Sequence, residues 1–268
     1  MTQIEKAARF HALHSRAGAF VIANPWDAVS ARLLAGLGFE ALATSSSAAA
    51  GVLGLRDGDL TREQALTHAG AIVQASDLPV SADLEGGYGD SPRAVAETIR
   101  LAAAAGLVGG SIEDATGDAH TPILKLGQAV ERVEAAVEAA RALPFQFTLT
   151  ARAENFLHGR ADLDDTIERL QAFERAGADV LFAPGLPDLA SVRAVCSAVS
   201  RPVSFMAGLR RRSFTVPELE RAGVRRISLA ASLFRAAMSG LVDAAREVRE
   251  LGTFTYLERD RTTREMGG

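Results

Sequence analysis

Cysteine is almost absent from this chain. The single thiol, Cys196, excludes an internal disulfide framework and any zinc site built from several cysteines. It lies within the helical pattern Leu189–Val199, so we interpret it as a small buried hydrophobe rather than a nucleophile. Aromatic residues make up only 6% of the chain, and we therefore expect a core built mainly from Ala, Val, Leu and Ile.

A strong net charge and long apolar runs are also missing. The 29 basic and 33 acidic residues leave a formal charge of −4, which gives no general attraction to nucleic acid or to an anionic membrane. No apolar stretch reaches the roughly 18 residues that span a bilayer, and Met1–Lys6 lacks the apolar run of a secretory signal. We expect a soluble, cytoplasmic protein that binds neither nucleic acid nor membrane.

One pattern recurs along the chain: a helix ends at a small residue and a glycine, and a short apolar strand follows. Glycine suits this position because it adopts the left-handed conformation that ends a helix. Short apolar strands are typical of parallel sheets that are buried on both faces. The copies lie at residues 34–43, 104–112, 175–182 and 221–229.

Four further strands, at residues 20–24, 79–83, 147–152 and 202–206, bring the expected number to eight. Helical patterns separate most of them, at Arg93–Ala105, Leu126–Leu143 and Asp164–Ala176. The order predicts an α/β protein with one (β/α)8 (TIM) barrel domain over residues 1–268. An open doubly wound sheet is the alternative, but no G-x-G-x-x-G turn follows the first strand.

Two carboxylates stand at the end of the strand that begins at Val80. Asp83 and Glu85 are two positions apart, so strand alternation predicts that they face the same point. A solvated acidic turn is the simpler interpretation. The glycine-rich turn that follows and a second strand that ends in Glu113 favour a site for Mg²⁺ or Mn²⁺ instead.

Other polar residues stand at the expected carboxyl ends of strands, where the active sites of such barrels lie. Arg152 can bind a substrate carboxylate through two hydrogen bonds, or pair with Glu154 or Glu113 inside the barrel. We interpret Asp27 as the N-cap of a helix, and His11, His14 and His68 as surface residues on helices. The run at 210–212 is a solvated basic loop or a late contact for an anionic substrate. The remaining strand-end candidates are Asn24, Ser45 and Ser46.

Several of these segments resemble the isocitrate lyase/phosphoenolpyruvate mutase superfamily over nearly the whole chain. The resemblance implies a (β/α)8 barrel whose last helix is exchanged between subunits, and a homodimer or homotetramer formed through residues of about 230–262. It also implies Mg²⁺ and cleavage or formation of C–C or P–C bonds next to a 2-oxo acid, through an enolate-like intermediate. The matching segments are Ser45-Ser46, Gly54–Asp57, Asp83–Gly89, Ile112–Asp114 and Ala151-Arg152.

By position, the resemblance places a metal site at four carboxylates, with Asp83 as the nearest ligand. Arg152 would bind the substrate carboxylate, and Asp57 and Glu113 would also serve catalysis. Ser45 and Ser46 would hold the 2-oxo acid end, with Asn24 beside them. The four metal-site carboxylates are Asp57, Asp83, Glu85 and Glu113.

The chain departs from the lyase pattern in the segment Glu113–Pro122, which has no cysteine to act as the acid. Water, Tyr88 or His120 would then supply the proton. We expect a Mg²⁺-dependent lyase or decarboxylase for a small 2-oxo or 2-hydroxy carboxylate, with oxaloacetate-type decarboxylation favoured over isocitrate cleavage. A P–C bond enzyme, and a catalytically degenerate barrel that binds a 2-oxo acid, are the alternatives.

Overall fold

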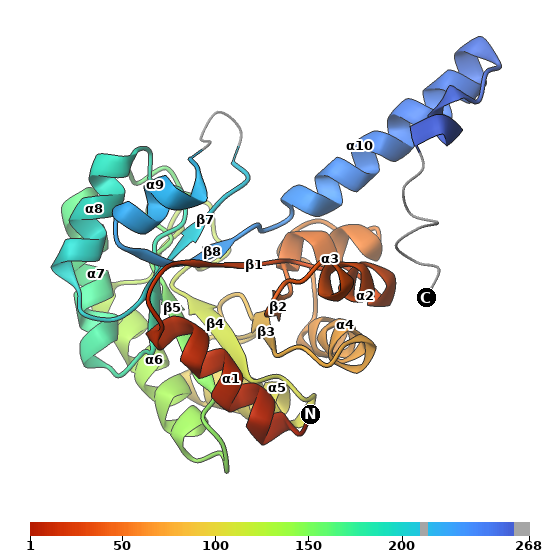
Figure 1. Cartoon of the computed structure of the whole chain (residues 1–268). Coiled ribbons are helices and arrows are strands. Elements are labelled where there is room, and N and C mark those ends of the chain that lie inside the picture. Colours follow the sequence, from red (N-terminus) through yellow and green to blue (C-terminus); the bar gives the residue numbers. More distant parts are fainter. Residues whose placement is uncertain (210–213, 260–268) are drawn as a thin grey trace.

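Eight parallel strands form a nearly closed barrel with helices around it, in a computed structural model that describes residues 1–209 and 214–259 (Figure 1). The strand order is β1-β8-β7-β6-β5-β4-β3-β2, and the isolated bridge between Ala23 and Leu42 joins the two ends of this order. The TIM-barrel-like α/β fold expected from the sequence is therefore confirmed. The strands are β1 (Phe20–Ile22), β2 (Leu42–Ala43), β3 (Val80–Asp83), β4 (Gly109–Glu113), β5 (Thr148–Arg152), β6 (Val180–Phe182), β7 (Val203–Met206) and β8 (Val224–Ser228).

The four helices whose bounds the sequence indicates, α5 to α8, begin and end within one or two residues of those positions. Caps and glycines mark many of the helix ends. Asp27 caps its helix by accepting a hydrogen bond from the Ser30 amide, as expected. Gly38, Gly106, Gly177 and Gly223 have φ between +88° and +101°. The helices are α1 (Gln3–Ser15), α2 (Ala28–Gly36), α3 (Ser46–Val52), α4 (Arg62–Ala75), α5 (Pro92–Ala104), α6 (Leu126–Arg141), α7 (Leu163–Arg175), α8 (Leu189–Ala198), α9 (Val216–Arg221), α10 (Ser232–Arg246), the π-helix η1 (Glu247–Leu251) and the 3₁₀-helix η2 (Thr255–Arg259).

Helix α1 closes the amino-terminal end of the barrel, and the prediction that His14 lies on the surface is wrong. Phe10 and Leu13 of α1 pack against Phe20 of β1 in one buried cluster. His14 is buried beside them, with its ring edge-on to both Phe10 and Phe20. The helix pattern alone did not show that this end of α1 lies against the strands. His68 is half-buried and bonds the Trp26 carbonyl.

The burial of His14 predicts a pH-dependent stability. Burial first, and then the charge of Arg226, lowers the pKa of His14 from 6.5 to about 3. The unfolded chain therefore binds one more proton than the folded chain between these values, and the free energy of unfolding should fall as the pH drops through this window. The expected slope is at most about 1.4 kcal/mol per pH unit. In urea unfolding at several pH values, the free energy of unfolding of His14→Leu should depend less steeply on pH than that of the wild type. The exposed control His120→Leu should match the wild type.

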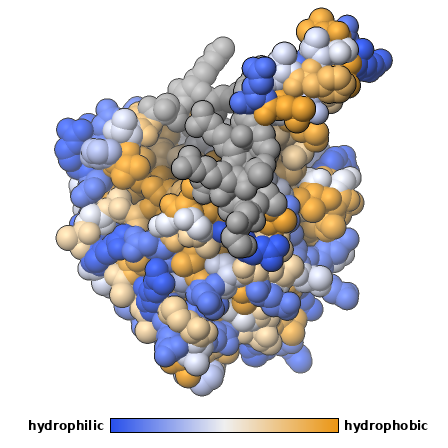
Figure 2. All heavy atoms as spheres, turned by 45° about the vertical axis from the view of Figure 1, so that its right-hand side comes forward, coloured by the Kyte–Doolittle hydropathy of each residue, from blue (hydrophilic) through white to orange (hydrophobic). Residues whose placement is uncertain are grey.

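Helix α10 leaves the barrel after its first turn and projects from it (Figure 1). Its base is anchored by Phe234, whose ring lies 5.7 Å from that of Trp26. Beyond this anchor, Leu241 is 61% exposed and Leu251 is 72% exposed. Figure 2 shows apolar side chains gathered along this projecting segment. No helix in the described ranges 1–209 and 214–259 is both long and apolar enough to cross a membrane.

Candidate functional site

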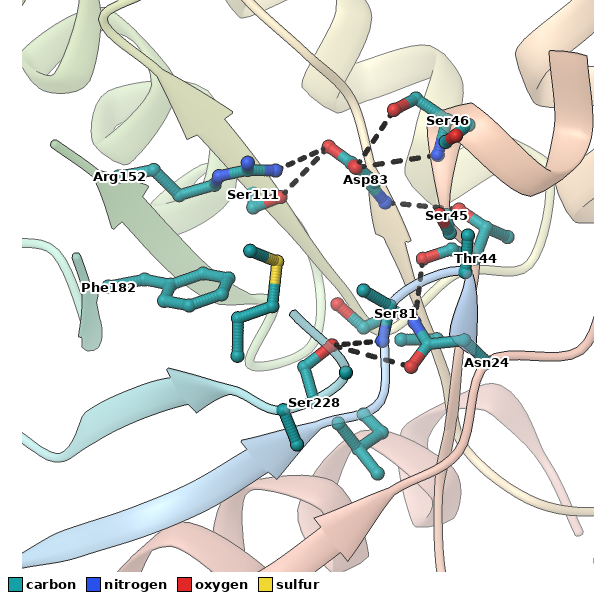
Figure 3. Close-up of a pocket in the computed structure, with 18 of the residues that line it drawn as sticks. Asn24, Thr44, Ser45, Ser46, Ser81, Asp83, Ser111, Arg152, Phe182 and Ser228 are labelled. Atoms are coloured by element: carbon teal, nitrogen blue, oxygen red, sulfur yellow. Dashed lines mark hydrogen bonds and ion pairs between the residues drawn. The ribbon is translucent and has the colours of Figure 1, made fainter. Parts of the chain in front are cut away.

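Three neighbouring strands bring three carboxylates around one guanidinium. Figure 3 shows two members of this cluster, Arg152 and Asp83, facing each other. The parallel register pairs Glu113 of β4 with Arg152 of β5, and Asp83 stands at the end of adjacent β3. Arg152 Nη1 lies 2.9 Å from Asp83 Oδ1, Nη2 lies 3.2 Å from Glu113 Oε2, and Nε lies 2.7 Å from Glu154 Oε1. The pairing of Arg152 with Glu154 and Glu113 inside the barrel is therefore observed, with Asp83 as a third partner.

This cluster carries more negative than positive charge in a poorly solvated place. Three ionised carboxylates against one guanidinium leave two negative charges. Burial raises the pKa of Glu113 well above its usual value, although Arg152 acts in the opposite direction. Burial likewise raises the pKa of Glu154. A further positive charge at this position would stabilise the ionised cluster.

Glu85 departs from the predicted geometry because β3 ends at Asp83. The backbone of Glu85 has φ +48° and that of Tyr88 has φ +54°, so the turn winds through the left-handed region that bulky residues rarely adopt. Asp83 lines the first of two adjoining cavities and Glu85 lines the second, so a turn rather than strand alternation positions Glu85 beside Asp83. Burial, and then the charges of Asp83 and Asp57, raises the pKa of Glu85 to about 7.

Two adjoining cavities flank the cluster. The first, of about 220 Å³, lies within the carboxyl end of the barrel. The second, of about 770 Å³, opens beside it between the turn at residues 85–90 and the segment 113–117. Arg152 and Asp57 line both, together with Ser46 and Leu157. The cluster therefore stands at the junction of a small inner pocket and a larger outer one.

The two candidate serines line the first cavity. Ser46 donates to Asp83 Oδ2 from its hydroxyl at 3.2 Å and from its amide at 3.4 Å. The amide of Asp83 in turn donates to Thr44 Oγ1 at 3.0 Å. Ser45 is the N-cap residue of α3, and its side chain makes no capping hydrogen bond. The serine segment and Asp83 are thus held together as one unit.

Asn24 also lines the first cavity, but its side chain is occupied by the protein. Its Nδ2 donates to the Thr44 carbonyl at 3.1 Å, and its Oδ1 accepts from the Leu229 amide at 3.0 Å and from Ser228 Oγ at 3.3 Å. Asn24 therefore links the ends of β1, β2 and β8. These contacts are within the protein, and the substrate-binding role of Asn24 stays a prediction.

The candidate proton donors are placed very differently. Tyr88 lines the second cavity with Glu85, and its hydroxyl is buried without a hydrogen-bond partner in the described part of the chain. His158 also lines the second cavity. His120 is exposed on its loop and lines neither cavity, so the structure does not bring it to the cluster. Its distance from the strand ends reflects the loop path, which the sequence does not reveal.

Sequence reasoning missed Arg226 and Phe182. The Phe182 ring lies 5.3 Å from the guanidinium carbon of Arg152 and supports it through a cation–π contact. Arg226 of β8 lines the first cavity. Strand alternation between Arg226 and Ser228 is a signal that could have found it. The basic run at 210–212 lies outside the described residues.

The donor set suits a hard divalent cation, although no three Asp, Glu, His or Cys side chains of the described residues are grouped as a ready-made metal site. Glu85 Oε1 is buried without a hydrogen-bond partner in the described ranges, and Asp83 and Glu113 share a single counter-charge. Mg²⁺ commonly takes one or two carboxylates and keeps several waters. The residues present therefore fit Mg²⁺ or Mn²⁺ bound partly through water.

Comparison with known proteins finds relatives over most of the chain. The family model for phosphoenolpyruvate phosphomutase matches residues 10–249. The chain is 32% identical to 2-methylisocitrate lyase from Escherichia coli over 256 residues, covering 91% of this chain and 84% of that protein. It is 30% identical to oxaloacetate decarboxylase from Pseudomonas aeruginosa over 252 residues, covering 91% and 86%.

Solved structures show the same relationship. A Burkholderia cenocepacia J2315 protein with a provisional lyase/mutase assignment superposes with a TM-score of 0.96 at 55% identity, covering 99% of this chain and 95% of that one. The 2,3-dimethylmalate lyase structure superposes with a TM-score of 0.84 at 25% identity, covering 93% and 89%. The fold, the length matched and the sequence identity agree, and the chain belongs to the phosphoenolpyruvate mutase/isocitrate lyase superfamily.

Proposed function

We propose that this protein is a divalent-metal-dependent carbon–carbon lyase or decarboxylase for a small 2-oxo or 2-hydroxy di- or tricarboxylate. The observation that carries the proposal is the buried cluster of Asp83, Glu113 and Glu154 around Arg152, beside a cavity of about 220 Å³. Relatives named for methylisocitrate and 2,3-dimethylmalate cleavage and for oxaloacetate decarboxylation support a lyase-type reaction.

In this proposal Asp83, Glu85, Glu113 and Asp57 hold Mg²⁺ or Mn²⁺, partly through water. When bound, the cation acts as a Lewis acid that polarises the 2-oxo group. Ser46 keeps Asp83 in position through its two hydrogen bonds, and Ser45 offers a hydroxyl free of helix capping to the substrate. Arg152 holds three carboxylates in one orientation and lines the first cavity, where a substrate carboxylate would bind beside it and the cation.

Proton delivery falls to a group other than a thiol. Tyr88 is the protein donor favoured by position, because it lines the second cavity with Glu85 and its hydroxyl has no hydrogen-bond partner in the described residues. Burial raises the pKa of Tyr88 above its usual value, which keeps the hydroxyl protonated at neutral pH. A substrate whose cleavage needs little acid assistance suits this arrangement, and decarboxylation of an oxaloacetate-like acid needs only a late proton.

A metal-dependent activity screen tests the proposal. Oxaloacetate, methylisocitrate, citramalate and phosphonopyruvate are each incubated with the protein and Mg²⁺ or Mn²⁺, with EDTA as the control. We expect turnover of oxaloacetate or a related dicarboxylate that EDTA abolishes. Turnover of phosphonopyruvate alone would favour a P–C bond enzyme, and binding without turnover of any of the four would favour a degenerate 2-oxo acid-binding barrel.

Cys196 should be dispensable for this reaction. The thiol is half-buried on α8, and burial raises its pKa to about 11, which suppresses the reactive thiolate. We expect Cys196→Ser to keep kcat/KM within about twofold of the wild type, and iodoacetamide to leave activity intact. Loss of activity in both experiments, with an unchanged circular dichroism spectrum, would refute the thiol-free route.

The projecting helix predicts an oligomer. Leu241 and Leu251 are exposed on α10 and η1, and a dimer or a tetramer of dimers would bury them against a neighbouring barrel. Light scattering at micromolar concentration should show an oligomer, which Leu241→Glu combined with Leu251→Glu should dissociate. Ile4→Glu is the matched control, because Ile4 is an exposed apolar residue on α1. It should leave the molar mass of the oligomer unchanged. A monomeric wild type would contradict the prediction.

A further inference from the structure

Arg226 lies deeper in the barrel than the carboxylate cluster. It precedes Ser228 by two positions on β8, so both side chains lie on the inner face, and both line the first cavity. Its charge also acts on His14 of α1, at the amino-terminal end. Arg226 is only 5% exposed. It therefore forms part of the floor of the cavity.

This buried guanidinium has no acidic partner in the part of the chain that the structure describes. Its Nε donates to Ser204 Oγ at 3.0 Å, and no carboxylate of the described ranges lies within 4.0 Å. Arg152 has three such partners, and Arg169 has two, in Asp114 and Asp165. A buried charge without a partner is strongly unfavourable, so this position suits an anion supplied from outside the chain.

The surroundings of Arg226 keep it cationic and leave room for an anion. Burial, and then the charge of Arg152, lowers the pKa of Arg226 to about 9, so it remains protonated at neutral pH. Ser81, Ser111 and Ser228 add hydroxyl groups to the wall of the same cavity. Arg235 also lines it, but that residue is exposed and already donates to the Gly208 carbonyl at 2.7 Å.

The two ends of the cavity therefore differ in the anion they can receive. At one end the carboxylate cluster and Arg152 suit a metal-bound 2-oxo or 2-hydroxy acid group. At the other end, the two Nη atoms of Arg226 have no hydrogen-bond partner among residues 1–209 and 214–259 and can donate to a second anion. A volume of about 220 Å³ is large enough for a molecule of four or five carbons that spans both.

We infer that Arg226 binds a second carboxylate of the substrate and makes the site selective for dicarboxylates over monocarboxylates. This inference rests on the proposed 2-oxo or 2-hydroxy acid site and names the substrate class within it. The residue acts on specificity, since it recognises the part of the substrate remote from the reacting carbonyl. Its removal should therefore affect dicarboxylates and leave monocarboxylates nearly unaffected.

Three stable ligands test the inference without turnover. Malate and 2-hydroxybutyrate share a 2-hydroxy acid end and differ in one carboxylate, and 2-hydroxy-3-phosphonopropionate carries a phosphonate at that position. Calorimetric titration of the wild type with Mg²⁺ present should show malate bound about tenfold or more tightly than 2-hydroxybutyrate. Arg226→Met should bring this ratio close to one, with the 2-hydroxybutyrate Kd changed by less than about threefold. Arg226→Lys should keep an intermediate ratio.

The matched control is Arg225→Met, because Arg225 is the neighbouring residue on β8 and faces out of the barrel toward Cys196. It should keep the wild-type ratio. The inference would be overturned if the wild type bound malate and 2-hydroxybutyrate equally well, or if Arg226→Met kept the wild-type preference for malate. If the methionine variant does not fold, the measurements on the wild type and on Arg226→Lys still decide the question. Tighter binding of the phosphonate than of malate would overturn the carboxylate assignment. Failure of the activity screen with the malate ratio intact would refute the proposed reaction alone.

Discussion

Replacing Asp83 with asparagine should lower the metal-dependent kcat/KM by about a hundredfold to a thousandfold. The amide keeps the shape of the carboxylate and can still accept from Ser46, so the serine segment should stay in place. It removes a negative charge that lines the inner cavity and that we expect to attract the cation. The loss should therefore appear in metal affinity as well as in turnover.

Calorimetric titration with Mg²⁺, together with steady-state kinetics on the substrate found in the screen, measures both effects. Asp77→Asn is the control, because Asp77 is an exposed acid that pairs only weakly with the amino terminus and Lys6. It should match the wild type in both measurements. Wild-type metal affinity in Asp83→Asn would remove Asp83 from the proposed metal site.

Replacing Arg152 with methionine should lower the free energy of unfolding by about 3–5 kcal/mol at pH 8, because it leaves buried carboxylates without a counter-charge. Loss of the Arg152 guanidinium raises the folded-state pKa values of Glu113 and Glu154 further above their values in the unfolded chain. The variant is therefore penalised most at high pH, and the penalty falls as the pH drops and these carboxyls take up protons.

Urea unfolding in EDTA at pH 8 and at pH 5.5 measures this difference. Arg152→Lys should restore part of the stability, since it keeps the charge, but it loses the planar fork that meets three carboxylates and should weaken 2-oxo acid binding by roughly 1–3 kcal/mol. Arg100→Met is the control, because Arg100 forms an exposed pair with Glu97. An equal loss for Arg152→Met at both pH values would contradict the explanation.

The repeated glycines and the strand-end residues were sufficient to predict the barrel and to bring Asp83, Glu113 and Arg152 together. Both depend on local rules: left-handed glycine ends helices, and parallel strands deliver their last residues to one rim. Glu85 and His120 were harder to place because a turn with positive φ and a loop path position them, and neither follows a simple periodicity.

The burial of His14 and the position of Arg226 depend on the whole assembly. Whether a residue of α1 is exposed depends on what the helix covers, and no local pattern indicated that α1 closes the barrel. The Asn24 amide was likewise recognised as a strand-end group, but its partners come from residues about 20 and 205 positions away. Contacts of such separation are not contained in any local pattern.

The link that Asn24 makes has a consequence for how this barrel opens. Between β1 and β2 the sheet is joined through the isolated bridge of Ala23 and Leu42, whereas the other neighbouring strands pair over two or more residues. The ring is therefore weakest at this seam, and one side-chain amide fastens it by holding the Thr44 carbonyl on one side and the Leu229 amide on the other. Local unfolding should start here, because a single side chain and one isolated bridge, rather than a ladder of paired residues, join these two strands.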